Sequence, residues 1–222
     1  MEDIKNKILS FYQQLESDTN HRYKSWEHCF MYFSQNGIDE RLACLHLSFY
    51  LASWGMYRGS SFLLWKDYLI HHEVVKRILS MQHLRHIDFS KECDAEIDKI
   101  FELSSWIRDW YQKNINNVNG EAKTVNVTDT LVTKILLGTL GCIPAYDRFF
   151  IDGLRKKELS HSKLSKNNFL SVVGFYKGNK DAFSYVQESI MRRSGICYPA
   201  MKLVDMYFWQ IGFELYEMNN RV

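Results

Sequence analysis

Proline is almost absent from this chain, and its scarcity limits the folds that the chain can adopt. Among 222 residues only Pro144 and Pro199 lack a backbone N–H group. Long stretches without proline, with apolar residues spaced three and four apart, are typical of α-helices. The sequence therefore predicts an all-α fold, with helices at residues 4–15, 24–34, 40–54, 62–70, 73–81, 95–113, 129–140, 147–157, 168–177, 181–194 and 199–218.

Local signals place several of these boundaries. Gly37 and Asp39 end one helix and cap the next, and Thr128 or Asp129 caps the helix at 129–140. The helix at 40–54 is apolar nearly all round, which predicts a place in the centre of the domain. The polar stretch 114–127 is the clearest loop.

The length and the apolar content of 46% suit one compact multi-helix domain, 1–222, with two lobes at 1–113 and 114–222 as an alternative. A cleft is then expected near the turn within 137–150. No early segment looks like a secretion signal, and no uninterrupted apolar run approaches about 18 residues. We therefore expect a cytoplasmic protein that does not enter the membrane, and we favour a monomer.

The five cysteines are scattered and form no C-x-x-C pair, so their spacing indicates neither zinc nor an iron–sulfur cluster. We expect reduced and mostly buried thiols. The paired histidines His71 and His72 lack carboxylates at metal-ligand spacing. The sequence predicts no metal and no other cofactor.

Charge is unevenly distributed along the chain. From Arg148 to Arg193 there are ten Lys or Arg and four Asp or Glu, a balance of +6, whereas the remainder carries 18 minus 22, or −4. A basic region on a nearly neutral protein can follow a phosphate backbone, although a solvated lysine-rich surface is the simpler interpretation.

The stretch "LGTLGCIPAYDRFF", residues 137–150, carries the most informative carboxylate. An apolar helix runs into two glycines and Pro144, and Asp147 follows between a tyrosine and an arginine. An aspartate at this place can cap the next helix by accepting hydrogen bonds from its free N–H groups. It can also face a substrate, and one carboxylate can do both.

Residues 115–150 resemble the core of the helix-hairpin-helix DNA glycosylases. A polar loop with Gly120, an apolar helix, a short turn and an aspartate at the next helix follow in the order of that superfamily. The resemblance implies that Asp147 is the catalytic carboxylate and that double-stranded DNA is the partner, with one base flipped out. Bifunctional members carry a lysine where Asp129 stands here, and Lys134 lies further along. The resemblance therefore implies a monofunctional enzyme, which leaves an abasic site.

The chemistry of base excision suggests further residues. Breaking an N-glycosidic bond builds positive charge on the sugar, which a fixed carboxylate stabilises, and the flipped base needs aromatic and polar walls. Candidates for the base pocket are Tyr146, Trp54, Tyr57, Arg58 and His46. Candidates for phosphate contacts are Arg148, Arg155, Lys156 and Lys157. The sequence does not identify the base, and bulky modified pyrimidines of phages, with a role in antiviral defence, are one hypothesis.

Two other functions stay open. Arg41 and His46 fit the R-x4-H pattern of HEPN-type ribonucleases, which are also all-α and usually build their sites from two chains. A non-enzymatic helical module that binds nucleic acid or protein is the other alternative, with Gly55 and Gly59 at a close helix crossing. Asp205 lies on an apolar helix, and we expect it to pair with Arg58 or a lysine, or to face a polar cavity.

Overall fold

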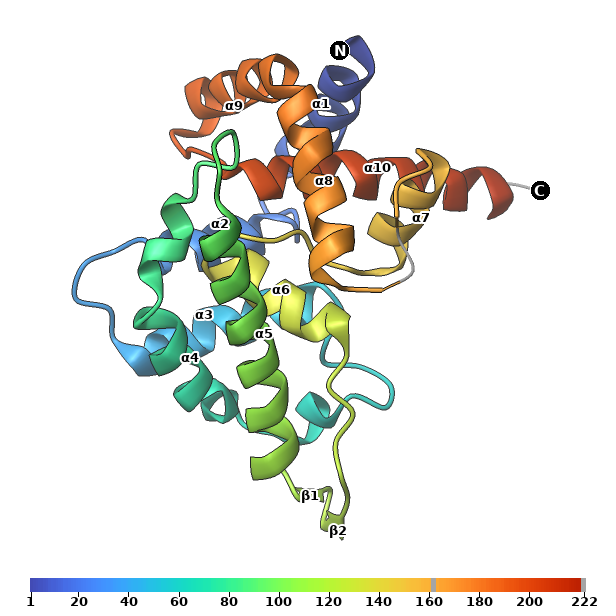
Figure 1. Cartoon of the computed structure of the whole chain (residues 1–222). Coiled ribbons are helices and arrows are strands. Elements are labelled where there is room, and N and C mark those ends of the chain that lie inside the picture. The colour runs from blue at the N-terminus through green and yellow to red at the C-terminus, as the bar shows by residue number, and fades with distance from the viewer. Residues whose placement is uncertain (161–162, 221–222) are drawn as a thin grey trace.

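The computed structural model describes residues 1–160 and 163–220, and helices form most of this part (Figure 1). The α-helices are α1 (Glu2–Glu16), α2 (Lys24–Tyr32), α3 (Glu40–Ser53), α4 (His72–Leu79), α5 (Asp94–Asn114), α6 (Asp129–Thr139), α7 (Arg148–Lys156), α8 (Lys166–Gly178), α9 (Lys180–Ser194) and α10 (Ala200–Asn220). Three short 3₁₀ helices are η1 (Phe62–Trp65), η2 (Tyr68–His71) and η3 (Gln82–His86). The predicted all-α fold is confirmed.

Side-chain caps begin several helices where the sequence predicts them. The Asp39 carboxylate accepts from the N–H groups of Arg41 and Leu42, at 2.8 and 3.0 Å. The Thr128 hydroxyl accepts from the N–H of Leu131 at 3.2 Å. Each cap satisfies a backbone donor that has no partner within its helix.

Two local predictions are wrong. Residues 62–70 form η1 and η2 instead of one helix, because the backbone is extended at Lys66 and Asp67, and the Asp67 carboxylate accepts from the N–H of Leu69 at 2.8 Å. The polar stretch 114–127 contains the hairpin of β1 (Asn117–Val118) and β2 (Glu121–Ala122). Asn119 and Gly120, with φ of 54° and 83°, supply the two positive φ angles that such a two-residue turn requires.

The helices lie in two groups, which Figure 1 shows one above the other. In one group α10 packs against α1, α7, α8 and α9, and in the other α3 packs against α2, α4 and α6. Contacts cross the predicted boundary at 113/114, since α1 packs on α10, and α6 packs on α2, α3 and α5. The division into lobes 1–113 and 114–222 stays a prediction.

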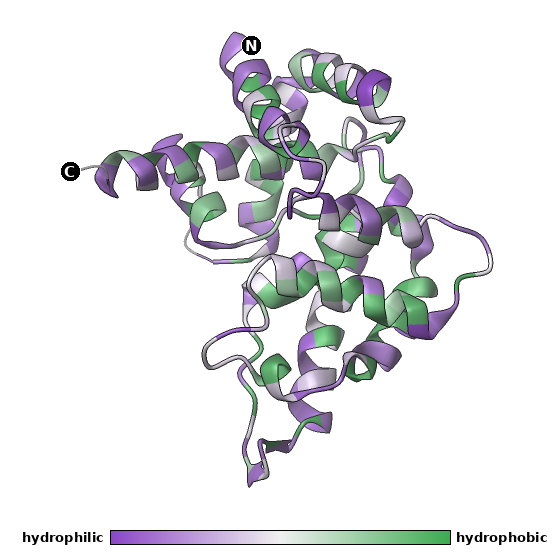
Figure 2. Ribbon diagram, turned by 180° about the vertical axis from the view of Figure 1, so that it is seen from behind, coloured by the Kyte–Doolittle hydropathy of each residue, from purple (hydrophilic) through white to green (hydrophobic). Residues whose placement is uncertain are grey.

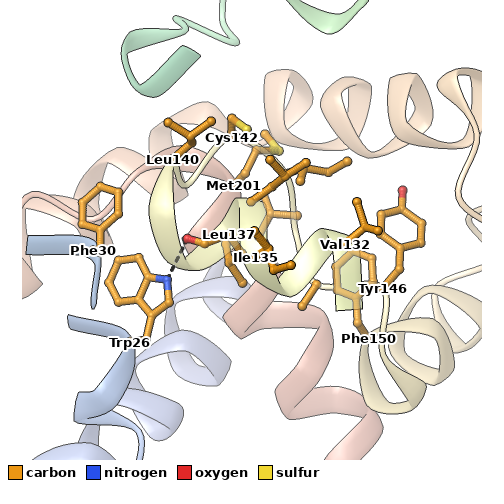
Figure 3. Packing of buried hydrophobic residues seen from close by; sticks show 14 of the residues in the cluster. Trp26, Phe30, Val132, Ile135, Leu137, Leu140, Cys142, Tyr146, Phe150 and Met201 are labelled. Carbon is orange, nitrogen blue, oxygen red and sulfur yellow. Dashed lines mark hydrogen bonds between the residues drawn. The ribbon is translucent and has the colours of Figure 1, made fainter. Parts of the chain in front are cut away.

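The central helix is α6, not α3 as predicted. All nine residues from Leu131 to Thr139 are buried, and Figure 3 shows Val132, Ile135 and Leu137 among the core side chains. On α3, in contrast, Leu42, Leu45 and Phe49 are 49%, 49% and 57% exposed. A helix that is apolar on all sides can lie in the centre of the domain, or it can leave some of its apolar side chains exposed. The sequence of the helix alone does not distinguish these two cases.

Helices α7 and α10 cross at two glycines. A Cβ added to Gly212 would lie 2.0 Å from the carbonyl oxygen of Phe149, and one added to Gly153 would lie 2.0 Å from that of Phe208. Only hydrogen atoms fit at this distance, so the glycines allow the two backbones to touch. Because Asp147 begins α7, this crossing also fixes its position relative to α10.

All five cysteines are free, and all but Cys197 are buried, as expected. Hydrophilic residues gather on the outer sides of the helices and at the end of α10 near the C-terminus (Figure 2). Among the described residues, none of the helices combines the length and the apolar character needed to cross a membrane.

Candidate active site

The turn before Asp147 is held by hydrogen bonds from two helices. The Asp205 carboxylate of α10 accepts from the N–H of Ala145 at 3.0 Å. The Thr133 hydroxyl of α6 accepts from the N–H of Tyr146 at 2.9 Å. Since both anchors come from buried helices, the turn presents Asp147 in one place.

The start of this turn requires glycine. Gly141 has a φ of 63°, and a Cβ there would lie 2.4 Å from the Pro199 ring. The glycine thus lets the chain reverse while Pro199, just before α10, packs directly against it.

Asp147 uses its two carboxylate oxygens differently. Oδ1 accepts from the N–H of Phe150 at 3.1 Å, so the predicted helix cap is confirmed. Oδ2 accepts from Nζ of Lys134 at 2.9 Å. The Asp147 side chain keeps 16% of its surface exposed, whereas that of Lys134 keeps 3%. The carboxylate therefore stands between a buried cation and the solvent.

A second ion pair lies in α10. Lys202 donates to Asp205 at 3.1 Å, and these side chains are 3% and 5% exposed. Burial lowers the pKa of Lys202, and the Asp205 carboxylate opposes this effect. Burial likewise raises the pKa of Asp205, against the effect of Lys202. The predicted pairing of Asp205 with a lysine is confirmed, and Arg58 is not its partner.

The two pairs line one small pocket together with aromatic rings. Its other walls are Tyr50, Trp54, Leu137, Ala145 and Trp209. The empty volume is about 190 Å³, spread over gaps too narrow for a water molecule. Nζ of Lys134 lies 5.0 Å, and that of Lys202 5.5 Å, from the centre of a Trp54 ring. The indole N–H of Trp54 is buried and finds no acceptor within the described part of the chain.

Tyr50 reaches this pocket because α6 has a glycine opposite it. A Cβ on Gly138 would lie 2.4 Å from the Tyr50 ring. The ring is fully buried, and burial raises the pKa of its hydroxyl well above the ordinary value, with Asp205 adding to the effect. Tyr50 thus stays neutral beside two carboxylates.

Of the predicted pocket residues, Trp54 lines the pocket and Tyr146 does not. The Tyr146 ring packs against Phe150, at 5.1 Å between centroids, and both rings lie among the core side chains (Figure 3). Its hydroxyl is buried and has no hydrogen-bond partner among the residues that the structure describes. The N–H of Asp147 donates back to the carbonyl oxygen of Ala145 at 2.8 Å, so the chain makes a tight turn at Tyr146. Ala145 and Asp147 line the pocket, and Tyr146 between them does not.

The remaining predicted pocket residues lie elsewhere. Tyr57 and Arg58 come after Gly55, where φ is 76° and the chain changes direction, and His46 lies earlier, on α3. The Tyr57 hydroxyl contacts His71 Nε2 at 3.0 Å. Arg58 packs beside Gly55 and lines a separate hollow with residues 123–126. His46 stacks on Tyr32 with 4.2 Å between centroids.

The predicted phosphate ligands lie on α7 and just after it, and two of them have acidic partners. Arg155 pairs with Asp152 at 2.6 Å, and Lys157 pairs with Asp3 at 2.9 Å. Arg148 lies over the ring of Tyr216, 4.7 Å from its centre. Arg148, Arg155 and Lys156 line one open hollow between α7 and the end of α10. The structure thus gathers three of the four predicted ligands.

Arg41 and His46 lie on the same helix, α3, five positions apart. Five residues along an α-helix correspond to a rotation of roughly 140°, so the two side chains leave α3 in different directions. Burial and His28 lower the pKa of His46, and Arg41 is exposed. The ribonuclease alternative, whose sites are usually built from two chains, stays a prediction.

Lys134 and Lys202 are charged site residues that sequence reasoning missed, along with the rings of Tyr50 and Trp209. Each is a single lysine in an otherwise apolar helix, within "TLVTKILLG" and "AMKLVDMYFW". A buried ammonium is costly without a carboxylate partner, so lone lysines in such helices were the available signal.

No family model, curated protein or solved structure gives a significant match to this chain. The likeness of residues 115–150 to the helix-hairpin-helix glycosylases therefore stays a prediction.

Proposed function

We propose that the protein is a DNA glycosylase whose catalytic carboxylate is Asp147. One observation carries the proposal: a partly exposed carboxylate, fixed at a helix start, opens onto a pocket with aromatic walls and two buried ion pairs. A core with four charges enclosed by aromatic rings is less stable than the same core filled by apolar residues would be. The presence of these charges therefore favours a functional reason for them.

The arrangement suits hydrolysis of an N-glycosidic bond. The C1′–N bond breaks and the base leaves with the bonding electrons. The oxygen of a water molecule bonds to C1′ and the water loses one proton, which balances the proton that the base takes up. Asp147 stabilises the positive charge that develops on the sugar and orients the water. Lys134 holds the carboxylate by its second oxygen, and Trp54 offers a ring and a free N–H to the base.

The pocket must open to admit a base, since its gaps do not hold even a water molecule. Trp54 is the wall best placed to move, because it is half-buried at the end of α3 and is followed by Gly55. The proposal therefore includes a displacement of the segment after Trp54 when the base enters.

A base-release assay tests the proposal. DNA carrying common lesions and phage DNA with modified bases are incubated with the protein and heated in alkali, which cuts at abasic sites. We expect alkali-dependent breaks that Asp147→Asn abolishes and that the control Asp109→Asn, an exposed aspartate on α5, retains. Borohydride traps an imine only if an amine attacks the sugar, so a monofunctional enzyme gives no trapped product. Breaks that persist in Asp147→Asn would refute the assignment.

One observation favours a second candidate, a binding module without enzymatic activity. The pocket is closed around its charges, as a purely structural ion-pair cluster would be. Under this alternative the same DNA panels stay intact with wild-type protein.

A further inference from the structure

Aromatic rings continue from the pocket to the surface along α7 and α10. Trp209 lines the pocket, and Phe149 packs edge-on against it with 5.2 Å between centroids. Phe213 stacks on Trp209 at 5.0 Å, and Tyr216 lies 5.6 Å from Phe149. The rings thus form a connected series from the floor of the pocket outward.

The outer members of this series face solvent. Tyr216 is 44% exposed, and Trp54, Phe149 and Phe213 are half-buried. We name Trp54, Phe149, Phe213 and Tyr216 the aromatic rim. Soluble proteins usually bury rings of this size, and uncovered rings beside a pocket indicate a surface that a ligand covers.

Cations accompany the aromatic rim. The guanidinium carbon of Arg148 lies 4.7 Å from the ring centres of both Phe149 and Tyr216. Beyond Tyr216, Arg148, Arg155 and Lys156 line a hollow with an empty volume of about 1100 Å³, in which the acids are Asp152, paired with Arg155, and Glu158. Figure 1 shows α7 and the end of α10 side by side at this place.

Exposed rings next to cations are the surface that single-stranded nucleic acids use. Unpaired bases offer their faces to aromatic side chains, and their phosphates contact lysine and arginine. In a duplex these faces are covered by neighbouring base pairs. We propose that the aromatic rim and Arg148 bind a single strand of nucleic acid, whose bases stack beside the pocket and whose phosphates enter the α7–α10 hollow.

This inference rests on the proposed glycosylase function, under which the strand is DNA. One base enters the pocket, and the next bases along the strand stack on Phe149 and Tyr216. The inference narrows the substrate from a duplex to a single strand, or to a duplex already opened at the target.

Binding of labelled strands of about 16 nucleotides, followed by fluorescence anisotropy, tests this inference. Tyr216→Ala removes an exposed ring and is expected to weaken binding of single-stranded DNA about tenfold. The control is Tyr185→Ala on α9, because Tyr185 is 51% exposed and has the cation of Lys5 4.1 Å from its ring centre. We expect the control to bind as wild type, and Arg148→Lys, which keeps the charge but loses the planar group, to bind more weakly.

Further strands distinguish the outcomes. 2-Aminopurine in the strand is expected to lose fluorescence on binding, because it stacks, and to lose less in Tyr216→Ala. Equal affinity of Tyr216→Ala and Tyr185→Ala, duplex DNA bound as tightly as the single strand, or binding of RNA but not DNA would overturn the inference.

The binding assay also separates this inference from the proposed function. Single-strand binding that depends on Tyr216, in a protein that releases no base, would sustain the aromatic rim and refute the glycosylase. If wild type and Tyr216→Ala released bases from duplex DNA equally well, the glycosylase would be sustained and the aromatic rim refuted.

Discussion

Acid should destabilise this protein through one buried histidine. His71 is fully buried, with Nε2 3.0 Å from the Tyr57 hydroxyl and Nδ1 hydrogen-bonded to the Tyr111 hydroxyl. Burial lowers its pKa from 6.5 to about 3. Between these values the unfolded chain binds a proton that the native protein excludes, so stability falls as the pH falls.

The pKa difference sets the magnitude. One pKa unit corresponds to about 1.4 kcal/mol, so the drop from 6.5 to about 3 amounts to about 5 kcal/mol when the pH reaches the folded value. Between pH 7 and pH 5 the loss due to His71 is about 2 kcal/mol. Above pH 6.5 this contribution to stability is fully present.

Urea denaturation at pH 7 and pH 5 measures this loss. His71→Gln keeps a donor and an acceptor for the two tyrosines but does not titrate, so its free energy of unfolding should fall by about 2 kcal/mol less than that of wild type. The control His83→Gln changes an exposed histidine and should behave as wild type. An identical loss in wild type and His71→Gln would refute the reasoning. Tyr57 contacts His71 and follows Trp54 by three residues. Protonation of His71 should therefore also loosen Trp54, which forms one wall of the pocket.

Two further substitutions test the scaffold of the site by urea denaturation. Asp205→Ala leaves Lys202 buried without its carboxylate and the N–H of Ala145 without its acceptor, and should lower the free energy of unfolding by about 3–5 kcal/mol. Asp205→Asn, which keeps an acceptor oxygen, should lose less, and equal losses would exclude a role for that hydrogen bond. Gly212→Ala places a Cβ 2.0 Å from the carbonyl of Phe149 and should destabilise by about 1–3 kcal/mol or more. Gly174→Ala, with open space around it, should stabilise by up to about 1 kcal/mol, and the Gly212 argument fails if the two variants behave alike.

The two salt-bridged lysines of the site show what the tertiary structure adds to the sequence. Lys134 lies on α6, Lys202 on α10 and Trp54 at the end of α3, and every two of them are more than 60 residues apart in the sequence. Asp147 was predictable because a turn followed by a helix start is a local signal. Its partner was not, because Lys134 reaches it only when α6 and the turn after it fold back on each other.

An ion pair within one helix is easier to predict from the sequence than a pair between distant segments. Asp205 in an apolar helix predicted a buried partner, and Lys202 three residues before it lies on the same face of the helix. The same spacing argument fails for Arg41 and His46, which one helix places on different faces.

The sequence by itself determined that the chain is helical, where most helices begin and end, and that Asp147 caps one of them, because these features depend on residues within one or two turns. It did not determine that α6 instead of α3 is the central helix, since both are apolar and only the packing of neighbours covers one and leaves the other uncovered. The tertiary structure alone brought two lysines, two aspartates and the rings of Tyr50, Trp54 and Trp209 to one pocket. Such a site depends on contacts between distant segments, which local periodicity cannot encode.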